Sequence, residues 1–167
     1  MDKAEFNLLS MRYWIRDAFT DKVKEKCNIR ARHCRGGSSE LFHLLKESPA
    51  THQYLDGDKL QIVSGLGHTF IRYKDDEFGR FIYIDPTIAQ FVPSFDGIFV
   101  GTADELRELV KEPGSRLNIK NYVENASYTG ISLPPLTIET NLMRYSTPKK
   151  TRKRRGQRKA SSFRKRY

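Results

Sequence analysis

The last 20 residues of the chain, 148–167, carry a charge that a compact fold cannot accommodate. They include eleven Lys and Arg residues and no Asp or Glu. The segment has few apolar side chains whose burial could offset the conformational entropy lost on ordering, and its like charges repel one another. We therefore expect residues 148–167, the basic tail, to be disordered when free. The fold must then be made by the residues before it.

The basic tail predicts a polyanionic partner. The 147 residues before it hold 19 basic and 20 acidic side chains, so the body is almost neutral although the chain as a whole carries +10. Such a cationic segment binds nucleic acid or another polyanion by displacing counterions, with little dependence on base sequence. The candidate nucleic-acid-binding residues are Lys149, Lys150, Arg152, Lys153, Arg154, Arg155, Arg158, Lys159, Arg164, Lys165 and Arg166. The alternative is a tail that only improves solubility.

Localisation follows from the same segment and from the cysteines. The run from Pro148 to Arg155 resembles a nuclear import signal. Two cysteines are too few for a disulfide framework and are typical of a reducing compartment, and no stretch approaches the length of a membrane span. We expect an intracellular protein that is nuclear or virion-associated, with the cytoplasm as the alternative, and no membrane span.

The body shows the patterns of an α+β fold. Apolar residues recur at steps of three and four from Asp2 to about Lys24, which predicts an amphipathic helix, and a shorter helix follows Cys34 and stops at Ser48-Pro49. A capping box at Thr102–Glu105 predicts a last helix that ends near Lys111. The predicted strands are Leu60–Val63, His68–Tyr73, Phe81–Ile84 and Ile98–Val100. Helices first and short strands next predict N-terminal helices packed on a small antiparallel sheet.

Three segments follow from these patterns. Residues 1–115 are expected to form the α+β domain, and residues 116–147 an irregular extension with Pro134-Pro135 inside it. The basic tail completes the chain.

Three residues have the chemistry of a thiol nucleophile and its supporting groups. Cys34 stands at the start of a predicted helix, where the helix dipole favours the thiolate. His68 opens one strand of a predicted hairpin and Asp85 ends the other, so hairpin geometry brings His68 and Asp85 together. A cysteine, an imidazole and a carboxylate that orients the imidazole are the parts that thiol catalysis requires.

Three sequence runs resemble the papain-like and transglutaminase-like thiol hydrolases, most closely the compact papain-fold toxin and effector deamidases. They are Cys34–Leu41, Gly65–Ile71 and Tyr83–Phe91, and the resemblance covers about Ile29 to Glu112. It implies a papain-like fold in which Cys34 is the nucleophile, His68 the general base and acid, and Asp85 the orienting carboxylate.

The resemblance also implies supporting roles. Gln90 and Phe91 would support the strand that carries the carboxylate. Thr69-Phe70 follows the histidine, where members of the family often have a small residue and Trp. No glutamine precedes Cys34, so Asn28 is the candidate side-chain donor to an oxyanion, together with a backbone N–H at Cys34.

Two functions remain open. The first is a cysteine hydrolase that acts on a protein or peptide amide through an acyl-enzyme, as a protease, an isopeptidase or a glutamine deamidase, or as a transglutaminase if an amine replaces water. The second is a non-catalytic, nucleic-acid-associated structural protein such as a virion component. We expect no cofactor and no metal, because Cys27, His33, Cys34 and His43 lack the usual zinc-ligand spacing.

Overall fold

The structure is a computed structural model that describes residues 2–28, 33–65, 67–122 and 127–128. It is an α+β fold, as the sequence predicts. The helices are α1 (Lys3–Lys26), α2 (Cys34–Glu47), α3 (Thr51–Tyr54) and α4 (Ala103–Val110), with short 3-10 helices η1 (Gly57–Lys59), η2 (Ile88–Gln90) and η3 (Ile119–Asn121). The strands are β1 (Leu60–Gly65), β2 (His68–Asp75), β3 (Arg80–Asp85), β4 (Phe99–Gly101) and β5 (Ser127–Tyr128).

The long first helix forms as its apolar spacing predicts. Asp2 caps α1, and a reciprocal contact with Glu5 completes a capping box. The buried side chains of α1 are Leu8, Met11, Ile15, Phe19 and Val23, which form one stripe along the helix. This stripe is the side of α1 that packs against the rest of the body.

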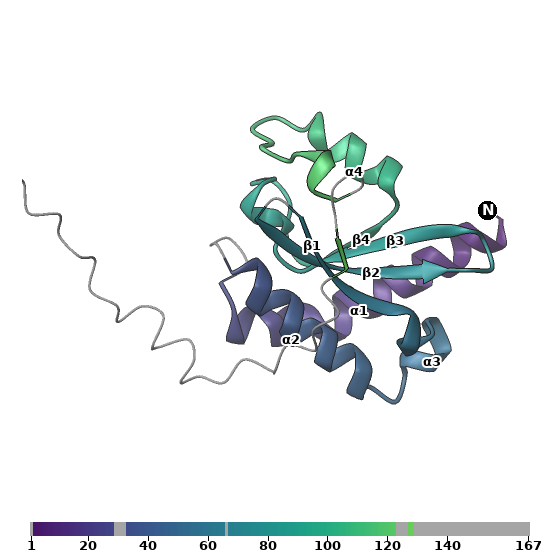
Figure 1. Ribbon diagram of the computed structural model, residues 1–167. Coiled ribbons are helices and arrows are strands. Elements are labelled where there is room, and N and C mark those ends of the chain that lie inside the picture. The colour runs from purple at the N-terminus through teal and green to yellow at the C-terminus, as the bar shows by residue number, and fades with distance from the viewer. Residues whose placement is uncertain (1, 29–32, 66, 123–126, 129–167) are drawn as a thin grey trace, which may run out of the picture.

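The strands form one twisted antiparallel sheet in the order β4-β3-β2-β1-β5 (Figure 1). The β2–β3 pair is the predicted hairpin, although both strands run closer to the turn than the sequence suggested, and Asp75 pairs with Arg80. Gly79 takes a positive φ of 61° in the turn between them, a conformation that glycine adopts without steric cost. The hairpin register places the start of β2 beside the end of β3.

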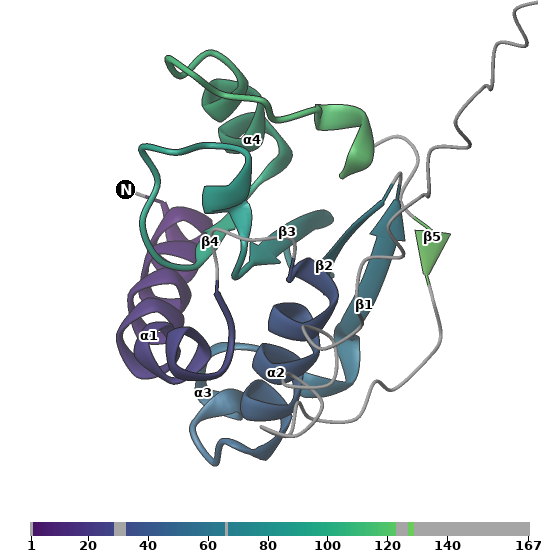
Figure 2. The same ribbon diagram turned by 90° about the vertical axis from the view of Figure 1, so that its left-hand side faces the viewer.

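Each face of the sheet has its own hydrophobic cluster. The first cluster joins α1 and α2 to strand residues such as Ile71 and Ile84. The second joins α4 and the segments around it to Phe70 and Tyr83, which alternate with the first set along the strands. Figures 1 and 2 show α1 and α2 on one side of the strands and α4 on the other.

The packed body continues beyond residue 115. The Arg116 N–H donates to the Phe91 carbonyl oxygen over 2.7 Å. Leu117 and Tyr122 are buried members of the second cluster, and Ile119 packs against it. Part of the segment predicted as an irregular extension therefore contributes to the core.

Electrostatic contacts connect the two sides of the body. Arg12 of α1 donates to the Val100 carbonyl oxygen over 2.8 Å and pairs with Glu105, which also belongs to the capping box of α4. The predicted Thr102–Glu105 capping box is thus confirmed.

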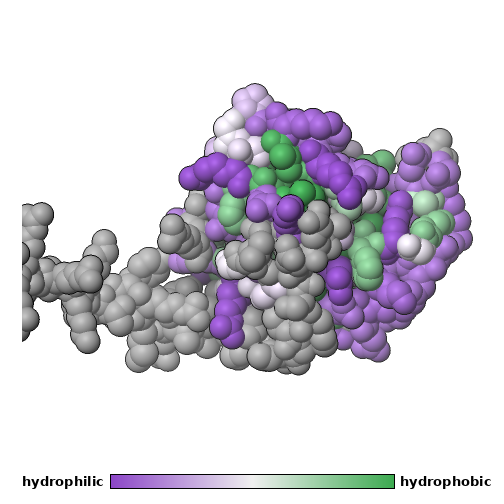
Figure 3. All heavy atoms as spheres, turned by 45° about the horizontal axis from the view of Figure 1, so that its top comes forward, coloured by the Kyte–Doolittle hydropathy of each residue, from purple (hydrophilic) through white to green (hydrophobic). Residues whose placement is uncertain are grey.

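On the outer surface around α4, most side chains are hydrophilic and surround a small hydrophobic patch (Figure 3). None of the helices in the described part of the chain is both long enough and apolar enough to cross a membrane.

Candidate active site

A buried histidine and aspartate form the centre of the site. Nε2 of His68, at the start of β2, lies 2.8 Å from Oδ2 of Asp85, at the end of β3. The His68 side chain is 1% exposed and that of Asp85 is fully buried. The predicted adjacency of the two residues is confirmed, and it follows from the hairpin register.

The Asp85 carboxylate has hydrogen-bond donors on both oxygens. Oδ1 accepts from the backbone N–H of Thr87 at 2.7 Å and from the Thr87 hydroxyl at 3.0 Å. Oδ2, which faces His68, also accepts from the Tyr122 hydroxyl at 2.5 Å. Burial opposes ionisation of Asp85, but the charge of His68 and these donors hold the pKa of the carboxyl below its ordinary value. The carboxylate is therefore ionised and fixed in orientation.

Sequence reasoning did not identify Tyr122. Its hydroxyl lies 3.0 Å from His68 Nε2 as well as against Asp85, and its ring centre is 5.1 Å from that of His68. The residues around it show no helical or strand periodicity in the sequence, so no local pattern marks it. Its burial against Phe70 becomes visible only when the chain after α4 returns to the sheet.

Cys34 is the first residue of α2 and lies beside this pair. Its Sγ is 3.9 Å from the carbonyl oxygen of Gly67, the residue that precedes His68. The N-cap residue of α2 is His33, whose side chain makes no capping hydrogen bond. Because the first N–H groups of a helix have no partner within it, the backbone around Cys34 offers donors and a positive dipole end.

A glycine allows α2 to approach the end of β3 closely. A Cβ at Gly37 would lie 2.9 Å from the Thr87 Cγ2 atom, closer than side chains normally pack. Thr87 is the residue that also holds Asp85. The glycine at position 37 thus brings the start of α2, with Cys34, against the His68–Asp85 pair.

The thiol and the imidazole change each other's protonation. Burial raises the pKa of Cys34, but a hydrogen bond with His68 and the charge of the imidazolium outweigh it, so the pKa lies below the ordinary 9.0. Burial lowers the pKa of His68, but the charge and hydrogen bond of Asp85, with a smaller contribution from Cys34, raise it from 6.5 to about 9. These opposite shifts favour a thiolate–imidazolium pair.

Gln90 lies on the other side of the imidazole. Its Nε2 is 3.4 Å from His68 Nδ1 and 3.2 Å from the Thr87 hydroxyl oxygen. Because Asp85 and Tyr122 occupy Nε2 of His68, Nδ1 is the ring nitrogen that remains to exchange a proton with Cys34. The Gln90 amide is therefore next to the ring nitrogen that is left for proton exchange.

The second cysteine has a different environment. Cys27 is 3% exposed in the first hydrophobic cluster, where burial first and then the negative charge of Glu40 raise the pKa of its thiol to about 11. Asn28, the predicted oxyanion donor, is exposed just after α1. Its predicted role stays a prediction, since residues 29–32, which connect it to the start of α2, lie outside the described residues.

The cationic residues predicted to bind nucleic acid, at positions 149–166, also lie outside the described residues. Within the described part of the chain, no cluster of three or more His, Cys, Asp or Glu side chains is arranged to hold a metal ion.

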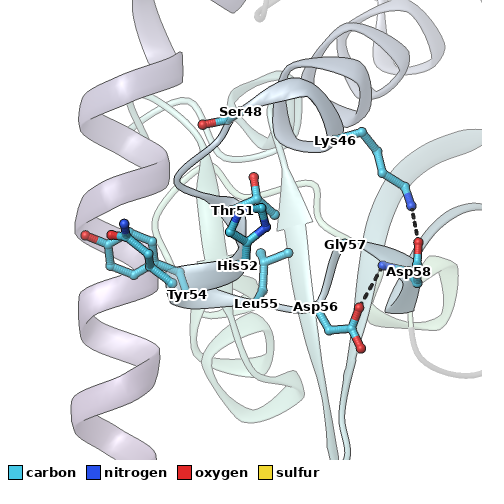
Figure 4. A pocket seen from close by; sticks show the side chains of 10 residues that line it. Lys46, Ser48, Thr51, His52, Tyr54, Leu55, Asp56, Gly57 and Asp58 are labelled. Atoms are coloured by element: carbon cyan, nitrogen blue, oxygen red, sulfur yellow. Dashed lines mark hydrogen bonds and ion pairs between the residues drawn. The ribbon is translucent and has the colours of Figure 1, made fainter.

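An open hollow of about 580 Å³ lies at the opposite end of α2 (Figure 4). Its lining is polar and includes Lys46, which contacts Asp58 at 3.0 Å, and Asp56, which accepts from the Asp58 N–H. A helix of this length spans about 20 Å, so the hollow is remote from Cys34. It is not part of the thiol site.

Comparison of the chain with protein-family models, with curated proteins and with solved structures found no match.

Proposed function

We propose that the chain is a cysteine hydrolase with a papain-like fold, which cleaves amides through an acyl-enzyme. The observation that supports it is the continuous set of contacts from Cys34 through His68 to Asp85, with a thiol pKa that is lowered and an imidazole pKa that is raised. A structural cysteine would not have a lowered thiol pKa, and the pKa of the buried Cys27 is raised instead.

The mechanism has two steps, acylation of Cys34 and hydrolysis of the thioester. The Cys34 thiolate attacks the amide carbonyl carbon, and protonated His68 gives its proton to the leaving nitrogen as the C–N bond breaks. The amine, or ammonia from a glutamine side chain, departs and leaves a thioester on Cys34. Neutral His68 then takes a proton from water as the resulting hydroxide attacks the thioester carbon, and the C–S bond breaks to release the carboxylic acid product and the Cys34 thiolate. The thiolate–imidazolium pair is thereby regenerated. Asp85 stabilises the imidazolium throughout.

The space beside the thiol suits an amide substrate. Gly67 has a φ of 84°, and a Cβ there would meet no atom of the described residues within 4 Å. The first-turn N–H groups of α2 are the backbone donors nearest to the oxyanion that develops on the carbonyl. An extended substrate segment would pass Gly67 with its carbonyl directed at the start of α2.

Selective alkylation tests the proposal. At a mildly acidic pH of about 6, where an ordinary thiol is protonated, iodoacetamide should label Cys34 far faster than Cys27, and peptide mapping by mass spectrometry can assign the site. Cys34→Ala should remove the fast labelling, whereas the matched variant Cys27→Ala should keep it. Equal rates at the two cysteines would contradict the proposal.

Product analysis then separates the reactions. Incubation with peptides that contain glutamine, followed by measurement of ammonia and of new peptide termini, distinguishes deamidation from peptide-bond cleavage. Both products must depend on Cys34. If a reactive Cys34 yields neither ammonia, nor cleavage, nor a thioester on any amide tested, the non-catalytic alternative is favoured.

The charge distribution supports a second proposal, that the basic tail binds nucleic acid. Eleven cations in 20 residues adjoin an almost neutral body. Full-length protein and a chain ending at Thr147 should be compared by DNA-binding titrations at several salt concentrations. The full chain should show a log–log salt slope that approaches about −10 if most of the cations contact phosphates, and the shortened chain should lose it. Binding with an unchanged slope after truncation would contradict this assignment.

A further inference from the structure

Tyr122 lies at the candidate active site, although it is outside the three sequence runs that resemble the thiol hydrolases. Its side chain is 1% exposed, and its hydroxyl is 2.5 Å from Asp85 Oδ2 and 3.0 Å from His68 Nε2. The Tyr122 hydroxyl is thus within hydrogen-bond distance of both His68 Nε2 and Asp85 Oδ2. Since a buried carboxylate is costly unless its oxygens are hydrogen-bonded, the phenol, after His68, helps to keep Asp85 charged.

We infer that Tyr122 is a positioning residue, whose hydroxyl donates to Asp85 and sets both the direction and the strength of the Asp85–His68 hydrogen bond. This inference rests on the proposed function for its effect on rate, but not for its effect on His68 itself. The Tyr122 hydroxyl contacts His68 and Asp85, so its main effect on the Cys34 thiol passes through His68.

The direction of donation follows from protonation. Burial first, and then the charge of Asp85, raise the pKa of Tyr122 well above 10, so the phenol keeps its proton wherever Asp85 is ionised. The hydroxyl can then donate to only one of its two neighbours, and the shorter contact is to Asp85. Tyr122 withdraws charge from Asp85 Oδ2 and limits how strongly this oxygen holds the His68 proton.

The backbone that carries Tyr122 is itself fixed. Asn118 accepts from the Lys120 N–H at 3.1 Å and opens η3, and the Tyr122 N–H donates to the Ile119 carbonyl oxygen at 3.0 Å. Leu117 is buried in the second cluster just before this turn. The phenol is therefore delivered by an ordered turn, which is what a group that orients another group requires.

Four titratable groups of the described residues surround the phenol. Asp85 and His68 contact the hydroxyl, Cys34 raises its pKa through space, and Tyr83 of β3 has its ring centre 6.5 Å away. Of these four, Asp85 and His68 are the two that loss of the hydroxyl affects directly.

Tyr122→Phe is the direct test. It keeps the ring and removes one donor from Asp85, so Asp85 becomes a stronger acceptor for the His68 proton. The pKa of His68, followed by NMR of the imidazole in the full-length protein, should rise above its wild-type value. The alkylation rate of Cys34 at neutral pH should stay at or above the wild-type rate, because the imidazolium that stabilises the thiolate persists. Amide hydrolysis that depends on Cys34 should fall about 10- to 100-fold, because the imidazole that donates the proton is less well oriented.

Tyr83→Phe is the matched control. It deletes the same hydroxyl from the neighbouring buried ring and should leave both the His68 pKa and the Cys34 alkylation rate unchanged. An unchanged His68 pKa in Tyr122→Phe, or a shift of equal size in Tyr83→Phe, would overturn the inference. A fall in the His68 pKa would show that the phenol acts as an acceptor from Nε2, and would overturn it as well.

A second variant avoids dependence on the folding of Tyr122→Phe. Site-specific 3-fluorotyrosine at position 122 keeps the shape and is a stronger donor, so the His68 pKa should move downward, opposite to the phenylalanine variant. A shift in the same direction for both variants would refute the assigned role. The imidazole titration reports on Tyr122 even if the protein hydrolyses no amide, so failure of the proposed function and failure of this inference give different results.

Discussion

The Cys34–His68 pair should limit activity at both ends of the pH range. The thiolate needs a pH above the lowered pKa of Cys34, and the imidazolium needs a pH below the His68 pKa of about 9. Cys34-dependent amide hydrolysis should therefore follow a bell-shaped pH profile whose alkaline limb lies near pH 9. A pH series of initial rates measures both limbs. A profile that kept rising with hydroxide concentration through this limb would contradict the ion-pair assignment.

Asp85→Asn should move the upper limb of that profile to lower pH. Without the carboxylate charge, burial dominates and the His68 pKa falls toward or below 6.5, so the thiolate loses its counter-ion near neutral pH. The rate should drop by about 10³- to 10⁴-fold, as expected when an orienting carboxylate becomes an amide. Imidazole NMR and initial rates together check this. Asp104→Asn, on the exposed side of α4, is a suitable control.

Removing the thiol should change how folding stability depends on pH. His68, with its pKa raised from 6.5 to about 9, contributes stability that is complete below pH 6.5 and lost as the pH rises through about 9. Cys34, with its pKa lowered, contributes the opposite trend, because the folded protein releases the thiol proton before the unfolded chain does. In Cys34→Ala the His68 trend stands alone.

The free energy of unfolding of Cys34→Ala should therefore fall more steeply with pH than that of the wild type, with a limiting slope of about 1.4 kcal/mol per pH unit. Urea denaturation at several pH values between 6.5 and 9, the two His68 pKa values, measures this difference. Parallel curves for the two proteins would mean that the thiol and the imidazole do not share a proton.

The contact between α2 and the turn after β3 predicts the effect of a single methyl group. Gly37→Ala would place a Cβ 2.9 Å from Thr87 Cγ2 and force α2 away from the turn that holds Asp85. We expect a loss of about 1–3 kcal/mol in the free energy of unfolding and slow alkylation of Cys34. Gly57→Ala is the matched control, because its Cβ would meet its neighbours at ordinary distances of 3.7 Å or more. Normal thiol reactivity in Gly37→Ala would contradict this role for the contact.

The helices and the hairpin could be predicted because their signals are local. The apolar spacing of α1, the Thr102–Glu105 capping box and the alternation along β2 and β3 each act within a few residues. Short elements such as α3 and the η helices were missed because one turn has no periodicity to detect. The strands were also predicted too short at the turn, where Asp75 and Arg80 are polar but still pair.

At the site, the predictable part was the part fixed by hairpin register. His68 and Asp85 meet because an antiparallel pair brings the two ends together, which the sequence shows directly. Tyr122 could not be predicted, since its place depends on how the chain after α4 returns over the second cluster. The contact of Gln90 with His68 Nδ1 likewise depends on the turn of η2, although the residue itself was identified.

The two clusters make the stability of the whole body depend on residues past 115. A chain ending at Ser115 would lose Leu117, Ile119 and Tyr122 from the second cluster. Leu117 and Tyr122 are buried, and each fully buried large side chain contributes about 1.5–3 kcal/mol, so with the partly buried Ile119 the loss is a large part of the total stability of about 5–15 kcal/mol of an ordinary domain. Thermal unfolding followed by circular dichroism should show the Ser115 chain unfolded or melting far below a chain that ends at Thr147. Equal melting temperatures would contradict this contribution.

The two cysteines lie in different parts of the body, and this separation makes them independent reporters. Cys34 can be reached from outside, whereas alkylation of Cys27 must wait until α1 and α2 separate in the native ensemble. Slow modification of Cys27 over hours would therefore measure how often the first cluster opens in the native ensemble. One time course on the unmodified chain could thus yield both a chemical rate and an opening free energy, without any added fluorophore or engineered label.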